Sequence, residues 1–438
     1  MEGNDFTGEE ILTRNDENHQ QNHDPHVVEE ETINAPKELK PSAKKALLEF
    51  RCRLEKAILT NDLFDNLEPE KNNSNSESDS IEDLSLREDI RDISLWGVPL
   101  LPSKGHEGTD IILLKFLRAR DFKVSEALEM LRKTLKWRKE FDTEGILEED
   151  FGSDLENVAY LDGSDKEGHP LCYIVYGAFR DKDLYQNMFE CENKWDKFIR
   201  WRIQSMERAI RNLSFKDGGM NSMVHITDLK SSPGPAMKDL RTASKKAISL
   251  LQDKYPEIVV RNIVINVPFW YYAYHALSSR MLTQRMRNKF VFARPSRVAK
   301  TLLKFIAPEN IPVQYGGLKR ENDDEFSPDD EVSEVTVKGG AVETIRITVN
   351  EPGVTVVWDI TVIGWDVTYK EEFIPDDEGS YKIVIQAEKK MLASVRSSYY
   401  INEPGKVELT ITNNTYKKKK ILHRFKIKPT VPMYVFLN

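Results

Sequence analysis

The sequence QDKYPEIVVRNIVINVPF, residues 252–269, places a Tyr-Pro-Glu triplet directly before an apolar run that ends in Asn-Val-Pro-Phe. The run from Ile258 to Val267 predicts a buried strand, because it is short and mostly apolar. Three further blocks stand around it in the order of the chain: LLKFLRAR at 113–120, DKEGHP at 165–170 and VQYGG at 313–317. The four blocks span about two hundred residues, which is the size of one ordinary domain.

Around these blocks, residues 155–317 alternate between strand patterns and helix patterns. Strands are predicted at 171–175 and 223–229, and helices at 194–211 and 237–255. Repeated strand–helix units favour a largely parallel sheet covered by helices. Upstream, the apolar spacing predicts two further helices, one that begins at Thr109 and one from Ser125 to Phe141.

The N-terminal segment differs in composition from the rest of the chain. The full chain has a net charge of −9, whereas residues 1–85 hold 21 acidic and 9 basic residues and carry −12. The remaining residues are therefore mildly basic, at +3. Such an acidic, polar segment cannot bury enough apolar surface to order itself, so residues 1–85 are predicted to be mostly disordered, with one short helix near 43–59.

The C-terminal residues show strand periodicity. Ile345, Ile347 and Val349 alternate with polar residues, as do the apolar residues between Val407 and Ile411. Strands of this length, separated by Glu-Pro-Gly and Asn-Asn turns, predict an antiparallel β-sandwich over residues 332–438.

The four ordered blocks resemble those of the CRAL-TRIO lipid-transfer domain with its helical lead-in. The C-terminal sandwich, which contains Trp358, the stretch GWDV at 364–367 and Tyr381, resembles the GOLD domain. The combination is similar to the patellin group of plant phosphoinositide-binding proteins. The resemblance implies a multidomain chain with a helical CRAL-TRIO N-terminal unit at 86–150, an α/β CRAL-TRIO lipid-binding domain at 151–320 and a GOLD domain at 332–438.

The resemblance also implies a lipid site. In phosphatidylinositol-binding members, a glutamate after Tyr-Pro and a lysine beyond a gate helix contact the head group, and these positions correspond to Glu257 and Lys289. In the family, a basic residue of the LRAR segment completes that site, and the corresponding candidate in this chain is Arg120. The gate helix corresponds to residues 275–287. We expect the acyl chains to meet Phe269, Leu277, Met281 and Leu282.

A second candidate site is a basic turn. Lys417, Lys418, Lys419 and Lys420 follow Asn413-Asn414, and Arg424 lies in the next predicted strand. Clustered basic residues gain about 1 kcal/mol each near an anionic membrane surface. We therefore predict that the turn binds anionic lipid. A solvated basic turn is the alternative. Nucleic acid is not expected as a partner, because no aromatic stacking platform or recognised motif accompanies the charges.

No catalytic motif is present in the sequence. It lacks the His-Glu-x-x-His, P-loop, Gly-x-Ser-x-Gly and dinucleotide-binding patterns, so we expect no enzyme, no cofactor and no metal. His169 before Pro170 is interpreted as part of a turn, and His225 as a buried structural histidine. The three cysteines, Cys52, Cys172 and Cys191, have no metal spacing and favour a reduced, cytoplasmic setting. Any membrane contact is expected to be peripheral, since no run of eighteen apolar residues occurs.

These observations predict a cytoplasmic, peripherally membrane-associated protein that holds phosphatidylinositol or a related phospholipid. By resemblance, it would act in vesicle trafficking and cell division at the plasma membrane or cell plate, on phosphoinositide-containing membranes. The alternative is a lipid-sensing adaptor that uses its GOLD domain to contact trafficking proteins.

Overall fold

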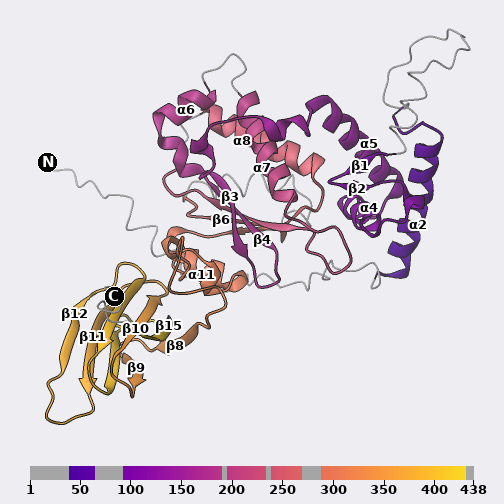
Figure 1. The fold of residues 1–438 in the computed structure, drawn as a ribbon. Coiled ribbons are helices and arrows are strands. Elements are labelled where there is room, and N and C mark those ends of the chain that lie inside the picture. The colour runs from indigo at the N-terminus through magenta and orange to yellow at the C-terminus, as the bar shows by residue number, and fades with distance from the viewer. Residues whose placement is uncertain (1–38, 65–91, 190–194, 233–237, 269–287, 431–438) are drawn as a thin grey trace, which may run out of the picture.

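The computed structural model describes residues 39–64, 92–189, 195–232, 238–268 and 288–430. They form a helical unit, an α/β domain and an antiparallel β-sandwich, in that order along the chain (Figure 1). This arrangement confirms the predicted fold class for the three ordered parts. Within the described residues, no helix combines the length and apolar character that a bilayer span requires.

The helical unit consists of three helices that pack on one another: α2 (Pro41–Leu59), α4 (Glu107–Ala119) and α5 (Val124–Phe141). Phe50, Leu54 and Ile58 recur at helical spacing on α2 and are fully buried in the shared core. α2 is therefore part of this unit rather than an isolated helix of the acidic segment 1–85. The unit and its connection to the next domain also contain β1 (Ser94–Leu95), β2 (Val98–Pro99) and short 3-10 turns at Pro102–Lys104, Gly145–Glu148 and Ser153–Leu155.

The α/β domain is built on a five-stranded sheet. Its strands lie in the order β3 (Ala159–Ser164), β4 (Pro170–Val175), β5 (Met223–Asp228), β6 (Val259–Ile265) and β7 (Phe290–Phe292). β3 is antiparallel to β4, and the other neighbours are parallel. A parallel sheet is normally buried on both faces, which is consistent with the apolar character of β6.

Helices cover both faces of this sheet (Figure 1). α7 (Asp196–Ile210) and α8 (Lys238–Lys254) lie on one side, with α6 (Lys182–Phe189) beside them, and α11 (Val298–Phe305) lies on the other. Successive residues of β4 point to opposite faces: Leu171 and Tyr173 pack with the α11 core, whereas Cys172 and Ile174 pack with α7. The domain also includes 3-10 turns at Tyr176–Arg180, Pro295–Arg297, Pro308–Asn310 and Val313–Tyr315.

The C-terminal domain is a sandwich of two four-stranded antiparallel sheets. One has the order β13 (Val395–Ile401), β10 (Val354–Val362), β15 (Lys419–Pro429), β8 (Ser333–Val337), and the other has the order β12 (Ile383–Lys390), β11 (Thr368–Pro375), β14 (Gly405–Thr412), β9 (Val342–Val349). Trp358 and Tyr369 are fully buried between the sheets. Their polar atoms bind the buried Glu371, with the Tyr369 hydroxyl donating over 2.7 Å, so the core leaves neither ring's polar atom unpaired.

The two domains are joined by a group of buried charges that we call the Asp359 cluster: Arg320, Asp323, Asp359, Arg396 and Arg424. Asp359 is completely buried and accepts hydrogen bonds from all three arginines. Arg424 also donates to the Leu318 carbonyl oxygen over 2.9 Å, and Arg396 binds Asp323 through both of its terminal nitrogens. Residues of the segment that leaves the α/β domain are therefore ion-paired to strands of the sandwich.

Asp323 is ionised in this cluster. Burial opposes its ionisation, but hydrogen bonds from Arg396 and from the backbone N–H groups of Phe326 and Glu325 lower its pKa to about 2. The Phe326 ring lies 4.4 Å from the Arg424 guanidinium carbon and covers the cluster.

Substitution of Asp359 by Asn should destabilise the sandwich strongly. The change removes one of two carboxylates that face three buried or half-buried guanidinium groups, and breaking a buried ion pair on one side costs about 3–5 kcal/mol. Urea unfolding of the full chain measures the change in free energy of unfolding. Asp324→Asn, at an exposed position of the same segment, is the matched control and should differ little from the parent. Equal stability of both variants would contradict the structural role of the cluster.

Candidate functional site

The structure brings Glu257 and Lys289 together at the amino ends of two neighbouring strands. Glu257 directly follows Tyr255-Pro256, adopts a φ of 55° and precedes β6, whereas Lys289 directly precedes β7. The Lys289 Nζ lies 2.8 Å from Glu257 Oε2 and also donates to the Val259 carbonyl oxygen. The two side chains are 16% and 6% exposed. Two residues that are distant in the sequence thus form one largely buried ion pair.

A third charged residue, Lys115 of α4, completes this group. Its Nζ donates over 2.9 Å to the carbonyl oxygen of Glu257, and the side chain is only 1% exposed. Burial lowers the pKa of Lys115 to about 7, against the attraction of Glu257; the positive charges of Arg118 and Lys289 lower it further. We call Lys115, Glu257 and Lys289 the polar triad. Glu257 thus contacts one amine through its carboxylate and the other, whose pKa is about 7, through its backbone carbonyl oxygen.

The resemblance predicts Arg120 as the third head-group residue, whereas in the structure Lys115 contacts Glu257. The structure places Arg120 at the C-terminal cap of α4, where its guanidinium donates to the neighbouring Ala119 carbonyl oxygen. No contact of Arg120 with Glu257 or Lys289 occurs among the described residues. The available signal for Lys115 was its position as the single charged residue of the apolar run Ile111–Leu117. The predicted acyl-chain residues Phe269, Leu277, Met281 and Leu282 lie outside the described residues.

The basic turn divides into two kinds of lysine. Lys419 donates to the carbonyl oxygens of Gly364 and Trp365, and Lys420 pairs with Glu334 over 2.6 Å. Lys417 and Lys418 are exposed, and within the part of the chain that the structure describes they have no ion-pair partner. Of the four lysines, these two are therefore exposed and free of a competing carboxylate among the described residues, whereas Lys420 is exposed but ion-paired.

The predicted patch does not include Arg424. Its side chain is 3% exposed and belongs to the Asp359 cluster on the outer face of β15, so its charge is already balanced by Asp359 and Asp323. The backbone of the turn is held by the buried Asn413. The Asn413 amide donates to the Lys417 and Lys338 carbonyl oxygens, and its oxygen accepts from the Thr415 N–H. The turn is thus a fixed platform for Lys417 and Lys418.

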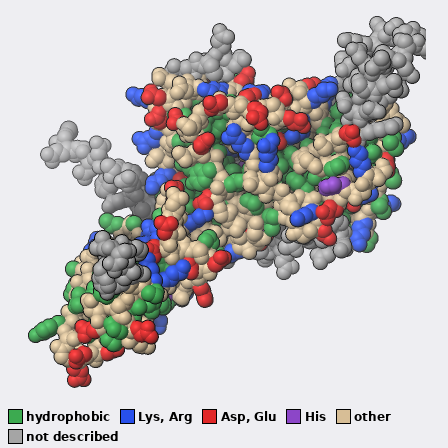
Figure 2. Space-filling view, in the orientation of Figure 1, with side chains coloured by type: hydrophobic (Ala, Val, Ile, Leu, Met, Phe, Trp, Pro, Cys, Tyr) green, Lys and Arg blue, Asp and Glu red, His purple; other side chains and the backbone are tan. Residues whose placement is uncertain are grey.

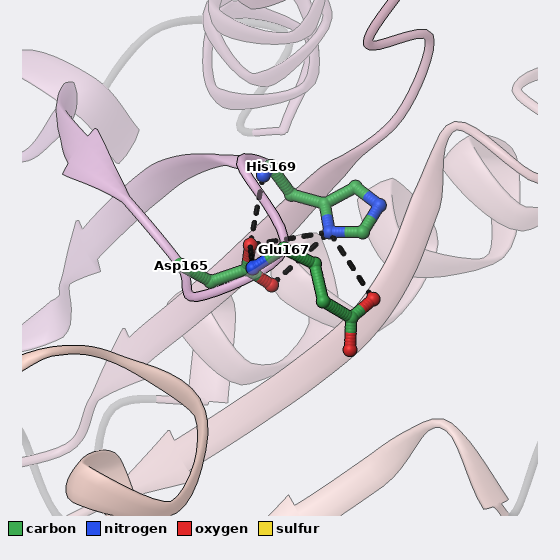
Figure 3. A group of neighbouring side chains, drawn as sticks. All are labelled: Asp165, Glu167 and His169. Carbon is green, nitrogen blue, oxygen red and sulfur yellow. Dashed lines mark hydrogen bonds and ion pairs between the residues drawn. The ribbon is translucent and has the colours of Figure 1, made fainter. Parts of the chain in front are cut away.

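The DKEGHP block forms a turn in which three potential metal ligands come close (Figure 3). The ligand atoms of Asp165, Glu167 and His169 lie within 4.8 Å of one another. Asp165 Oδ1 already accepts hydrogen bonds from the Glu167 and His169 backbone N–H groups, and its carboxylate also binds His169 Nδ1 at 3.1 Å. Burial opposes ionisation of Asp165, but these bonds lower its pKa. The group therefore closes the turn that precedes β4, and Gly168 supplies its φ of 92°.

Comparison with known proteins places three family models along the chain. The CRAL/TRIO N-terminal domain matches residues 62–133, the CRAL/TRIO domain matches residues 156–317, and the patellin-1-like C-terminal GOLD domain matches residues 338–419. The order of the models is that of the three folded parts.

Individual relatives agree with these models. Patellin-4 of Arabidopsis thaliana is 53% identical over 77% of this chain and 62% of its own length. Patellin-3 of the same plant is 45% identical over 81% of this chain and 76% of its own length. A phosphatidylinositol transfer protein of Cryptococcus neoformans, SFH5, is 30% identical over 51% of this chain and 79% of its own length. The chain spans only 62% and 52% of patellin-4 and patellin-5, respectively.

Replacement of Lys115 by Met should change how stability depends on pH. The Lys115 pKa is about 7 in the folded protein against an ordinary value of 10.5. Between these values the unfolded chain binds the extra proton, so this group makes the parent's free energy of unfolding rise with pH. The variant lacks this rise, and its stability relative to the parent should fall as pH increases from about 7 to about 10.

Denaturant unfolding of both proteins at several pH values measures this difference. Lys139→Met, at an exposed position of α5, should follow the parent at every pH. A Lys115→Met difference that is constant over the whole range would show that Lys115 does not titrate there.

Proposed function

Because this chain belongs to the patellin family, we propose that it binds one phosphatidylinositol-type lipid in its CRAL-TRIO domain and transfers or presents it at phosphoinositide-containing membranes during vesicle trafficking. The observation that carries the proposal is the polar triad, in which a carboxylate and two amines are held together at the edge of the central sheet. We propose no enzymatic activity and no cofactor besides the bound lipid. The proposed location is the cytoplasm, with peripheral attachment to the plasma membrane or the cell plate.

The proposed head-group chemistry follows from the charges of the triad. A carboxylate such as Glu257 accepts hydrogen bonds from inositol hydroxyl groups, and an ammonium such as Lys289 neutralises a phosphate. Lys115 adds a second amine, whose pKa of about 7 leaves it partly protonated at neutral pH. A nearby phosphate would favour its charged form. Lys115 therefore replaces Arg120 as the third proposed head-group residue.

The acyl chains require an enclosed apolar space. A chain that leaves the bilayer exposes methylene groups at a cost of about 0.8 kcal/mol each, which only an apolar cavity offsets. Phe269, Leu277, Met281 and Leu282 remain our proposed contacts for these chains, although they lie outside the described residues. The SFH5 relative is named as a phosphatidylinositol transfer protein, which supports this class of ligand.

A second function is supported by apolar side chains on the sandwich surface. Tyr381 is 91% exposed and Leu392 is 84% exposed, and Val384 on the edge strand β12 is also largely exposed. Figure 2 shows apolar side chains that reach the surface of this domain. Such positions suit protein contacts. The alternative proposal is thus a lipid-sensing adaptor that binds trafficking proteins through its GOLD domain. Movement of lipid between vesicles by the purified chain would favour transfer over this adaptor role.

Removal of the Glu257–Lys289 ion pair should reduce loading with phosphatidylinositol. The double variant Glu257→Gln/Lys289→Met removes both partners, so neither is left buried without the other, and Lys115 can lose its proton because burial already lowers its pKa. Charge-assisted hydrogen bonds contribute about 1.5–3 kcal/mol each, so loading should fall about tenfold or more. Native mass spectrometry of the full chain after incubation with phosphatidylinositol vesicles measures the bound fraction.

Loading with diacylglycerol, which lacks the charged head group, should be nearly unchanged in this double variant. Lys300→Met, at an exposed position of α11, is the matched control for loss of a lysine. Equal loss of both lipids would reject the head-group assignment, whereas no lipid on the parent protein would reject lipid binding itself.

Loss of the two exposed turn lysines should weaken membrane binding without affecting the pocket. Each contributes about 1 kcal/mol near an anionic surface, so Lys417→Gln/Lys418→Gln should bind phosphoinositide vesicles about thirtyfold more weakly at low salt. The difference should shrink at physiological salt, where the Debye length is about 8 Å. Vesicle co-sedimentation across a salt series measures it. Lys389→Gln/Lys390→Gln on β12 removes the same charge elsewhere on the domain, and an equal effect there would contradict a specific role of the turn.

A further inference from the structure

Arg202 of α7 is a buried arginine whose charge no carboxylate balances among the residues that the structure describes. Its side chain faces the sheet, and the residue is only 5% exposed. Its guanidinium carbon lies 5.6 Å from the centre of the Trp201 ring, but within the described residues it forms no ion pair or hydrogen bond. In this it differs from Arg424, which is equally buried but bound to two carboxylates.

The titratable side chains of the sheet that lie near Arg202 are neutral. Cys172 of β4 and His225 of β5 are direct neighbours in the sheet, and both are buried. Burial raises the pKa of the Cys172 thiol to about 11, although Arg202 lowers it. Burial, with a further contribution from Arg202, lowers the pKa of His225 to about 3. At neutral pH, neither residue can supply the missing negative charge.

Glu207 of α7 and Asp228 of β5 are bound to other residues. Glu207, further along α7, pairs with Arg138 and accepts a hydrogen bond from the Tyr255 hydroxyl. Asp228, at the end of β5, accepts from the Tyr315 hydroxyl and the Asn266 amide. An unbalanced buried ion is costly, and buried charges in proteins are normally paired. The position therefore fits a guanidinium whose counter-ion comes from a ligand.

We propose that Arg202, with His225 beside it, binds a monoanionic group carried by an apolar ligand inside the CRAL-TRIO domain. This proposal rests on the proposed lipid-binding function but assigns a second polar contact, apart from the triad. His225 lies opposite Asn262 of β6, three residues from Val259, whose carbonyl oxygen binds Lys289. At about 3.3 Å per residue, the two positions are about 10 Å apart along the strand.

The chemistry of the ligand group follows from the surroundings. A single guanidinium matches one carboxylate or one phosphodiester through paired hydrogen bonds, and a neutral imidazole can add one N–H donor. The adjoining residues Ile174, Ile203 and Met206 are apolar and buried, so the rest of the ligand is expected to be hydrocarbon. A fatty-acid carboxylate and a phospholipid phosphodiester share this chemistry. Because one phosphodiester cannot reach both Lys289 and Arg202, the second case requires a lipid whose phosphate lies at Arg202 instead of at the triad.

Arg202→Met tests the proposal, because it keeps the length of the side chain and removes its charge. The affinity of the full chain is measured for oleate and oleyl alcohol by displacement of a fluorescent probe, and for phosphatidylinositol and diacylglycerol by vesicle loading. The variant should bind oleate or phosphatidylinositol about tenfold more weakly, and the corresponding neutral lipid equally well. Loss for oleate identifies a carboxylate, and loss for phosphatidylinositol identifies a phosphodiester.

Two further variants separate charge from structure. Arg202→Lys keeps the charge and should retain most of the preference for the anion, and Arg208→Met, exposed on the same helix, should behave as the parent. The ligand-free Arg202→Met protein should also unfold at the same or a higher temperature than the parent, because an unbalanced buried charge is removed. A marked loss of stability would instead show that Arg202 is structurally paired, and would overturn the proposal.

The remaining outcomes are also decisive. Unchanged anion preference in Arg202→Met overturns this inference and leaves the proposed function intact, whereas failure of the parent to bind any of the four amphiphiles overturns both. Inorganic phosphate alone provides the last comparison. If it raises the unfolding temperature of the parent but not of Arg202→Met, the site takes a free anion, and the assignment to an apolar ligand is wrong.

Discussion

The buried carboxylate of Asp359 is the contact on which the union of the two folded domains depends. It lies on β10 in the centre of one sheet of the sandwich, and it binds arginines from two neighbouring strands and from the segment that leaves the α/β domain. With no exposure to water, its charge has to be balanced by the protein. Three guanidinium groups surround Asp359, and Asp323 binds two of them. These contacts therefore hold the segment that connects the two domains, which would otherwise be an acidic, solvated linker.

The need to balance a buried charge distinguishes three positions in the molecule. In the Asp359 cluster, the protein supplies both signs of charge and the arrangement is structural. In the polar triad, Glu257 is shared between Lys289 and Lys115, and the deep burial of Lys115 brings its pKa to about 7. At Arg202 the described part of the chain supplies only the positive charge. The series runs from complete balance to none, and the less balanced positions are those inside the proposed lipid-binding domain.

The carboxyl and amino ends of the strands in the central sheet have different roles. In open α/β sheets, ligands usually bind beyond the carboxyl ends of the strands. Here the polar residues at those ends, Asp228 and Asn266, bind each other, and Asp228 also binds the Tyr315 hydroxyl. They fasten the VQYGG segment to the sheet. The polar triad lies instead at the amino ends of β6 and β7, so the lipid site proposed there departs from the general rule for the fold class.

The sequence by itself determined the order and class of the folded parts, because strand and helix periodicity and the four ordered blocks are local properties. Glu257 and Lys289 came from the resemblance to phosphatidylinositol-binding members, whose head-group positions these two residues match, and not from a local pattern. The tertiary structure alone decided which other charges are available. Lys115 meets Glu257 across 142 residues, and Arg424 meets Asp359 across 65. Burial and ion pairing of this kind depend on the packing of distant segments, which local pattern does not record; for that reason Arg120 was selected in place of Lys115, and Arg424 was assigned to a surface it does not reach.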